Sequence, residues 1–129
     1  MDTSISVLVV DDSKTTVRIV CQMLQKCGFN NIAEAPNGVV AFELLRSGKF
    51  DLVISDVGMV PMNGIELLQA VRVDRILRDT CFILMTALRE TAGVLATKEY
   101  SADALLLKPF TAEMLNQELL RLEKLNPQR

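Results

Sequence analysis

The sequence predicts an α/β protein in which a parallel five-stranded sheet is covered by helices on both faces. Two observations lead to this class. Short runs of aliphatic, often β-branched residues recur along the chain, as expected for strands buried on both faces. Between them lie longer segments whose apolar residues recur at helical spacing. Five such strands alternating with five helices imply a doubly wound sandwich with right-handed crossovers.

The first part of the chain shows this alternation clearly. A strand is predicted at 5–10, which reads ISVLVV, and a more polar strand at 31–35, which suits a sheet edge. Ser13 can cap the helix between them, and Gly28 can end it in the left-handed conformation. The apolar positions of that helix follow the i, i+3, i+4, i+7 rule and are Val17, Val20, Cys21 and Leu24.

The rest of the chain continues the pattern with three strands and four helices. The strands are predicted at 51–55, 81–86 and 104–107. The helices are predicted after the turn at 36–38, from Gly64, within 89–100, and from about Thr111 to Leu125. We therefore expect a single domain over 1–129, with its core at about 5–125.

Composition excludes several classes of function. The net charge is −2, which gives no basic surface for nucleic acid, and no apolar run approaches the roughly 20 residues that a membrane span needs. The start of the chain carries an acid rather than a basic segment, so we expect no secretory signal and a cytoplasmic protein. The three cysteines, Cys21, Cys27 and Cys81, form no CxxC and are expected to be small buried hydrophobes. The chain has no histidine, which excludes histidine acid–base catalysis and the common zinc sites.

Chemically compatible side chains follow four of the five predicted strands. They are Asp11 and Asp12, Asp56, Thr86, and Lys108. Ligands of open parallel sheets bind outside the carboxyl ends of the strands, where these residues converge if the four strands are neighbours. Three close carboxylates repel one another and raise at least one pKa, and Mg²⁺ relieves such repulsion. One carboxylate oxygen would remain free as a nucleophile, with Thr86 and Lys108 binding a phosphoryl group.

Each of these residues also has a purely structural interpretation. The acids in the sequence DDS can favour a helix N-terminus through the macrodipole, Thr86 can be a turn residue, and Lys108 can be an ordinary surface lysine. Asp56, at the end of an apolar strand, is harder to explain in this way. The functional hypothesis therefore depends on the combination rather than on any single residue.

The combined motifs resemble the receiver domain of two-component response regulators, in its single-domain, CheY-like form. The matching segments are VVDDS, DLVISD, NGIEL, LMTA and LLLKPF, in order and across essentially the whole chain. The resemblance implies a flavodoxin-like sheet in the order 2-1-3-4-5. It also implies Asp56 as phosphoacceptor, Thr86 as switch hydroxyl and Lys108 as the phosphoryl-binding lysine. The implied Mg²⁺ ligands are Asp11, Asp12, Asp56 and the backbone carbonyl of Gly58, and a cis peptide bond is implied between Lys108 and Pro109.

Three departures from the family pattern bear on how such a receiver would work. Leu105 stands where the family usually has Tyr or Phe, which affects the coupling of phosphorylation to partner binding. The proline of the loop after Asp56 is shifted by one place to Pro61, so that Val60 precedes it. Gly58 and Leu88 occupy two positions that often carry polar side chains and influence the lifetime of the phosphoryl group.

The resemblance also implies partners. A sensor histidine kinase or a histidine phosphotransfer protein would donate the phosphoryl group, because the chain itself has no histidine. A downstream protein would bind the face formed by the helix within 89–100, the strand at 104–107 and the last helix. We expect no nucleic acid or membrane as partner, a monomer or weak homodimer, and no enzymatic activity beyond its own phosphorylation and dephosphorylation.

Three other functions share parts of this pattern. A degenerate receiver could act as a protein-interaction scaffold, although all five chemical positions are present. Phosphatases with an aspartate nucleophile have the sequence D-x-D, whereas Asp11 and Asp12 are adjacent. Flavodoxin-like cofactor binders have a phosphate-binding loop rich in Gly, Ser or Thr after the first strand, and this chain has none.

Overall fold

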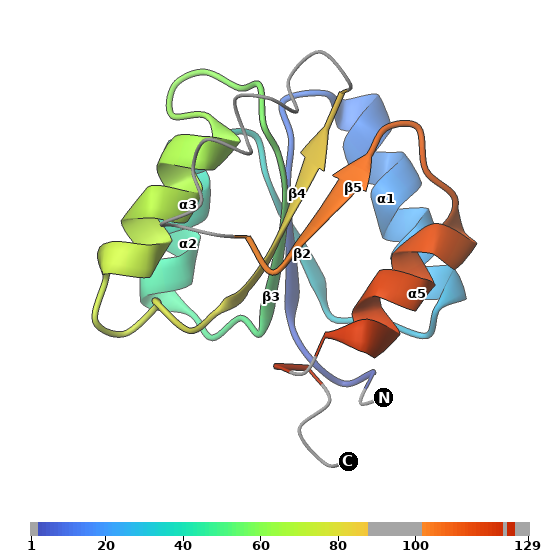
Figure 1. The fold of residues 1–129 in the computed structure, drawn as a ribbon. Helices are drawn as coiled ribbons and strands as arrows, with labels where there is room; N and C mark the ends of the chain where they lie inside the picture. The colour runs from blue at the N-terminus through green and yellow to red at the C-terminus, as the bar shows by residue number, and fades with distance from the viewer. Residues whose placement is uncertain (1–2, 88–101, 123, 126–129) are drawn as a thin grey trace.

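The structure, a computed structural model, describes residues 3–87, 102–122, 124 and 125 (Figure 1). Its five parallel strands lie in the order β2-β1-β3-β4-β5, which confirms the predicted fold class and strand order. The strands are β1 (Val7–Val10), β2 (Ile32–Ala35), β3 (Leu52–Asp56), β4 (Cys81–Thr86) and β5 (Ala104–Leu107). The helices are α1 (Lys14–Lys26), α2 (Gly38–Ser47), α3 (Gly64–Val73) and α5 (Ala112–Arg121). The helix predicted within 89–100 and Leu88 lie outside the described residues.

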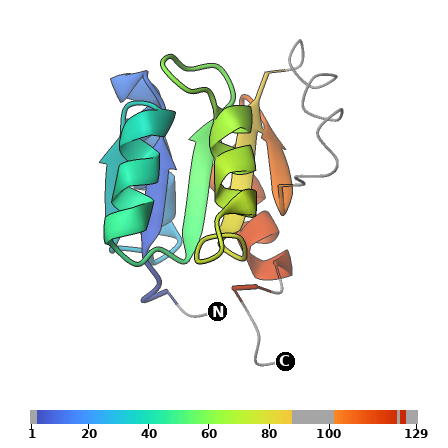
Figure 2. The ribbon, with the colours of Figure 1, turned by 90° about the vertical axis from the view of Figure 1, so that its left-hand side faces the viewer.

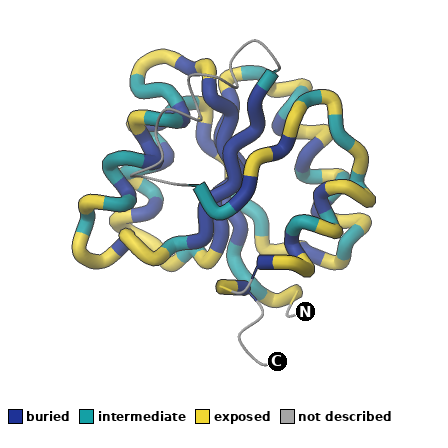
Figure 3. Tube along the Cα trace, viewed as in Figure 1, coloured by how far each residue is buried: buried dark blue, intermediate teal, exposed yellow. Residues whose placement is uncertain are grey.

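The sheet separates two hydrophobic cores, because successive side chains of a strand point to opposite faces. Val7 and Val9 of β1 face α1 and α5, whereas Leu8 and Val10 face α2 and α3. Figure 2 shows α2 and α3 side by side on their face of the sheet. The three inner strands are fully buried, and the polar edge strand β2 is only partly covered (Figure 3). The inner strands can therefore end in buried polar residues at a fixed position.

The structure confirms the two predicted caps of α1 and shows a further cap at the start of α3. The Ser13 hydroxyl accepts a hydrogen bond from the Thr16 backbone N–H at the start of α1. Gly28, just past the end of α1, adopts a φ of 98°, a conformation that favours glycine. Asn63 and Glu66 form a reciprocal capping box at the start of α3. The caps at Ser13 and Asn63 lie where the chain leaves the carboxyl edge of the sheet, and Gly28 lies where it turns back toward the next strand.

Two predicted boundaries are wrong by a few residues. The first strand begins at Val7 rather than at residue 5, because the Ser6 N–H bonds the Asp51 carboxylate instead of a strand backbone. The last helix ends at Arg121 rather than near Leu125. Leu122 has extended backbone, and both leucines, at 122 and 125, are buried against the core beside α1. Burial of these side chains outweighs continuation of the helix. In the described ranges, every helix is too short or too polar to cross a lipid bilayer.

Candidate functional site

Three carboxylates gather at the carboxyl edge of the sheet. Asp11 and Asp12 directly follow β1, and Asp56 is the last residue of the neighbouring strand β3. The register pairs Val10 with Ser55, which brings the ends of the two strands level. One carboxylate oxygen from each acid lies within 4.8 Å of the other two. The structure thus brings together the three acids that the sequence singles out.

Two of these acids are held inside the protein. Asp11 is 4% exposed and Asp56 is 7% exposed, whereas Asp12 is exposed to solvent. The Asp11 Oδ1 atom accepts a hydrogen bond of 2.9 Å from the Ser13 N–H, and its own N–H donates to the Ala35 carbonyl. The Asp11 Oδ2 and Asp56 Oδ1 atoms are buried, and among the described residues both face the same single cation, Lys108. Buried carboxylates that share one cation are costly, which is typical of a site built for a ligand.

Burial raises the pKa of Asp11 from 3.8 to about 6. The negative charges of Asp56 and Asp12 act in the same direction, while the Ser13 N–H and the Lys108 ammonium lower this pKa. The expected rise is therefore present, but desolvation rather than repulsion between the acids is its largest cause. A cation placed among the three acids would lower the pKa again.

Lys108 supplies the positive charge at this edge. It follows β5, and its Nζ forms an ion pair with Asp56 Oδ1 and lies 3.9 Å from Asp11 Oδ2. This ammonium is the only cation among the described residues that pairs with either buried carboxylate. The Lys108 N–H donates to the Thr86 carbonyl at 2.9 Å, and the peptide bond between Lys108 and Pro109 is cis. One lysine thus faces two buried carboxylates.

Thr86 ends β4, next to the strand that ends in Asp56. It is 1% exposed, and the register pairs Met85 with Asp56, so Thr86 lies one residue beyond that level. Its hydroxyl donates to the Ala87 carbonyl at 3.1 Å. The hydroxyl is therefore at the predicted edge, but its hydrogen bond is to the backbone and not to a carboxylate.

The loop after Asp56 carries the remaining predicted positions near the acids. Gly58 is exposed, two residues beyond Asp56, and Val60 is 81% exposed before a cis bond to Pro61. Leu105 belongs to β5 and is 37% exposed on the face opposite the buried Ala104 and Leu106. Leu105 is therefore partly exposed at the protein surface.

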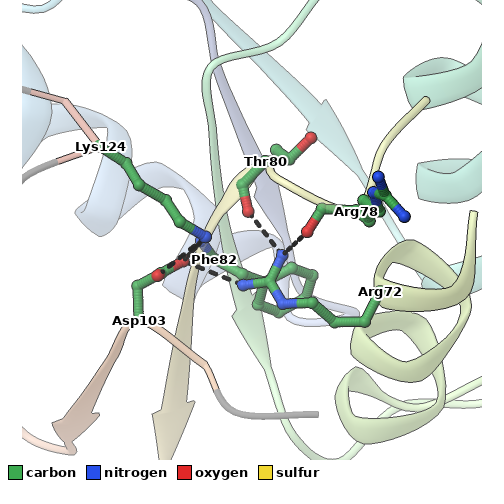
Figure 4. Close-up of polar contacts among 6 residues, drawn as sticks. All are labelled: Arg72, Arg78, Thr80, Phe82, Asp103 and Lys124. Atoms are coloured by element: carbon green, nitrogen blue, oxygen red, sulfur yellow. Dashed lines mark hydrogen bonds and ion pairs between the residues drawn. The ribbon is translucent and has the colours of Figure 1, made fainter. Parts of the chain in front are cut away.

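Sequence reasoning missed a second charged cluster, which lies at the opposite end of the sheet (Figure 4). Asp103, just before β5, accepts hydrogen bonds from the Phe82 N–H at 2.8 Å and from Arg72 at 3.0 Å. Its other oxygen is 3.1 Å from the Lys124 ammonium. Arg72 also donates to the carbonyls of Arg78 and Thr80. No pattern in the sequence marks Asp103, because its partners come from three separate segments.

Comparison with known proteins places the chain in a family. Residues 7–120 match the model of the response regulator receiver domain. The chemotaxis protein CheY of Pseudomonas aeruginosa is 36% identical over 121 residues, which cover 93% of this chain and 98% of that protein. The chemotaxis protein CheY-3 of Vibrio cholerae is 34% identical over 119 residues, which cover 92% of each chain.

Solved structures agree with this result. The receiver domain of a signal transduction histidine kinase from Syntrophus aciditrophicus superposes with a TM-score of 0.86 at 29% identity, covering 98% of this chain and 93% of that one. The response regulator CheY4 of Vibrio cholerae gives 0.83 at 32% identity, with 93% and 99% covered. The chain therefore belongs to the response regulator receiver domain family. Within that family it is a CheY-like receiver domain, which is a signalling module.

Proposed function

We propose that this receiver accepts a phosphoryl group on Asp56 in a Mg²⁺-dependent reaction and thereby changes its affinity for a partner protein. One observation supports this most directly. Asp11, Asp12 and Asp56 bring three carboxylates together, two of them buried, and Lys108 is the only cation among the described residues that forms an ion pair with either buried acid. A purely structural cluster would have its buried charges balanced.

The residues present fit Mg²⁺. Asp11, Asp12 and Asp56 offer three oxygen ligands within 4.8 Å of one another, and the loop carbonyl of Gly58 is the proposed fourth protein ligand. Mg²⁺ prefers oxygen ligands and retains several waters, which suits a site with one exposed side. When bound, the ion would neutralise the charge that accumulates on the phosphoryl oxygens during transfer. The raised pKa of Asp11 fits a cluster whose charge is not fully balanced by Lys108 alone.

The protein's own groups have separable roles in the transfer. A carboxylate oxygen of Asp56 forms the new P–O bond, the P–N bond to the donor's imidazole breaks, and the bonding electron pair stays on that nitrogen. Lys108, already paired with Asp56, would bind a phosphoryl oxygen. Thr86 would exchange its hydrogen bond to the Ala87 carbonyl for one to the phosphoryl group. Attack of water on phosphorus would later break the P–O bond to Asp56, release inorganic phosphate and restore the carboxylate.

The proposed partners are a phosphohistidine protein as donor and a downstream protein as target. The donor must be a different molecule, because the chain has no histidine. We place the target on the face that includes β5, where Leu105 and Leu107 are 37% and 45% exposed. Because Leu105 has no polar group, phosphorylation would alter the packing of this face rather than a hydrogen bond made by a tyrosine hydroxyl.

Incubation with acetyl phosphate and Mg²⁺, followed by intact-mass measurement, tests the proposal. We expect an added phosphoryl group that requires Mg²⁺ and is absent from Asp56→Asn. Beryllofluoride, which binds acyl-phosphate sites, should alter the NMR spectrum of the wild type only. Absence of a Mg²⁺-dependent change at Asp56 would favour an interaction scaffold, and continuous hydrolysis of many phosphate esters would favour a phosphatase.

A further inference from the structure

The loop from Val57 to Asn63 joins Asp56 to α3 and contains the proposed metal ligand Gly58. Its first residue is fixed, because the Val57 N–H donates to the Met85 carbonyl and the Val57 carbonyl accepts from the Gly64 N–H. From Gly58 to Pro61 the loop makes no hydrogen bond with any other described residue. The orientation of the Gly58 carbonyl therefore depends on what holds the loop on either side of this unbonded stretch.

The far side of that stretch is held by α2. The N–H of Gly38, the first residue of α2, donates to the Met62 carbonyl at 3.0 Å. Met62 also packs its side chain on the core beneath α2 and α3. Its φ is 62°, in the left-handed region that non-glycine residues rarely adopt, so the contact with α2 must offset a backbone cost.

The contact requires a glycine at position 38. A Cβ on Gly38 would lie 2.5 Å from Met62 Cγ and 2.6 Å from the Met62 carbonyl oxygen. One of these two atoms belongs to the backbone, so rotation of the methionine side chain alone cannot make room. Gly48, at the other end of the same helix, is different, because a Cβ there would meet its nearest atoms at 3.4 Å.

We infer that Gly38 and Met62 form the outer anchor of the metal-binding loop, and that Gly38 is a positioning residue for Mg²⁺ binding. The inference rests on the proposed function, since it assumes that Gly58 contributes its carbonyl. A side chain at position 38 pushes Met62 and its carbonyl away from α2. The shift reaches Gly58 through three residues, of which Val60 and Pro61 lie exposed on the surface and only Met59 is buried. We therefore expect a substitution at Gly38 to weaken Mg²⁺ binding, although α2 contributes no metal ligand.

The test is a titration with Mg²⁺ alone, followed through the backbone amide signals of ¹⁵N-labelled protein. We expect Gly38→Ala to bind Mg²⁺ about tenfold more weakly than the wild type, in the range known for residues that support metal ligands. The matched variant Gly48→Ala should bind as the wild type does. In the metal-free spectrum, Gly38→Ala should shift the signals of the loop while leaving those of β4 unchanged, which a general loss of stability would not do.

The outcomes separate this inference from the proposed function. If the wild type itself binds no Mg²⁺, both are overturned. If the wild type binds and Gly38→Ala binds equally well, the anchor is overturned and the proposed function stands. Should Gly38→Ala fail to fold, Met62→Ala replaces it, because this variant removes the side-chain half of the contact without introducing a clash. Weaker binding by Met62→Ala would then support the anchor, and wild-type affinity would overturn it.

Discussion

Two charged clusters lie at opposite ends of the same sheet, and they differ in how their charges are balanced. At the carboxyl edge, three acids face one lysine, which is the only cation among the described residues that pairs with the two buried carboxylates. At the amino edge, the single carboxylate of Asp103 is paired with Arg72 and Lys124 and accepts the Phe82 N–H (Figure 4). Both clusters are partly or fully buried, so burial does not distinguish them.

The difference teaches which cluster contributes to stability and which to function. A buried carboxylate with cations and backbone donors around it stabilises the fold, because its loss would remove the charged acceptor that those groups share. Buried carboxylates that share too few cations to balance their charge cost stability and are retained for another reason. The cluster of Asp103 is therefore the structural one, and the cluster of Asp11 and Asp56 is the one prepared for a ligand.

The largest effect on stability should come from Asp103→Ala. The substitution leaves the largely buried guanidinium of Arg72 and the N–H of Phe82 without their carboxylate, and we expect a loss of about 2 to 4 kcal/mol in the free energy of unfolding. Urea denaturation measures it. Asp51→Ala is the matched control, because Asp51 is an exposed acid whose carboxylate accepts, among the described residues, the Ser6 N–H alone, and the variant should lose about 1 kcal/mol. Equal losses of unfolding free energy in the two variants would show that Asp103 stabilises the fold no more than an exposed acid does, and would contradict its assignment to a structural cluster.

Asp11→Asn should increase the free energy of unfolding of the metal-free protein, whereas Asp103→Ala decreases it. The raised pKa means that the folded state holds a proton on Asp11 more tightly than the unfolded state does. The protonated Asp11 carboxyl therefore stabilises the folded state below about pH 4, and this stabilisation is lost as pH rises from about 4 to about 6. After allowance for solvent screening, we expect the variant to be about 1 to 2 kcal/mol more stable than the wild type at pH 7.

Urea denaturation in EDTA at pH 4.5 and pH 7 measures this effect, with Asp51→Ala again as control. The gain from Asp11→Asn should shrink at the lower pH, where the wild-type carboxyl is largely protonated. Mg²⁺ at about 100 times its dissociation constant should stabilise the wild type by about 2.7 kcal/mol and should stabilise Asp11→Asn much less. A variant that is less stable than the wild type at both pH values would contradict the assignment of Asp11 to an unbalanced cluster.

The parts of the molecule that could be predicted are those encoded by local pattern. The buried strands, the helix caps at Ser13 and Gly28, and the strand order that follows from the family resemblance are all present. The convergence of the acids followed from topology, because parallel strands end at one edge. Asp103 could not be predicted, since its role depends on contacts with segments far apart in the sequence. The contact between Gly38 and Met62 was missed for the same reason, as a clash at one glycine is a property of the folded backbone.

Lys108→Ala should have the smallest effect on stability and a large effect on phosphorylation. The Lys108 side chain is a third exposed and its ammonium interacts with Asp56 and Asp11, so its loss should cost about 1 kcal/mol or less at pH 7. The cost should fall at pH 5, because protonation of Asp11 relieves the repulsion that Lys108 balances. The spectral response to beryllofluoride and Mg²⁺ should be largely lost. Lys14→Ala is the matched control, because Lys14 lies beside Asp11 but forms no ion pair with a described residue. Unfolding of Lys108→Ala would instead place this lysine with Arg72 among the structural cations, and the contrast between the two clusters would fail.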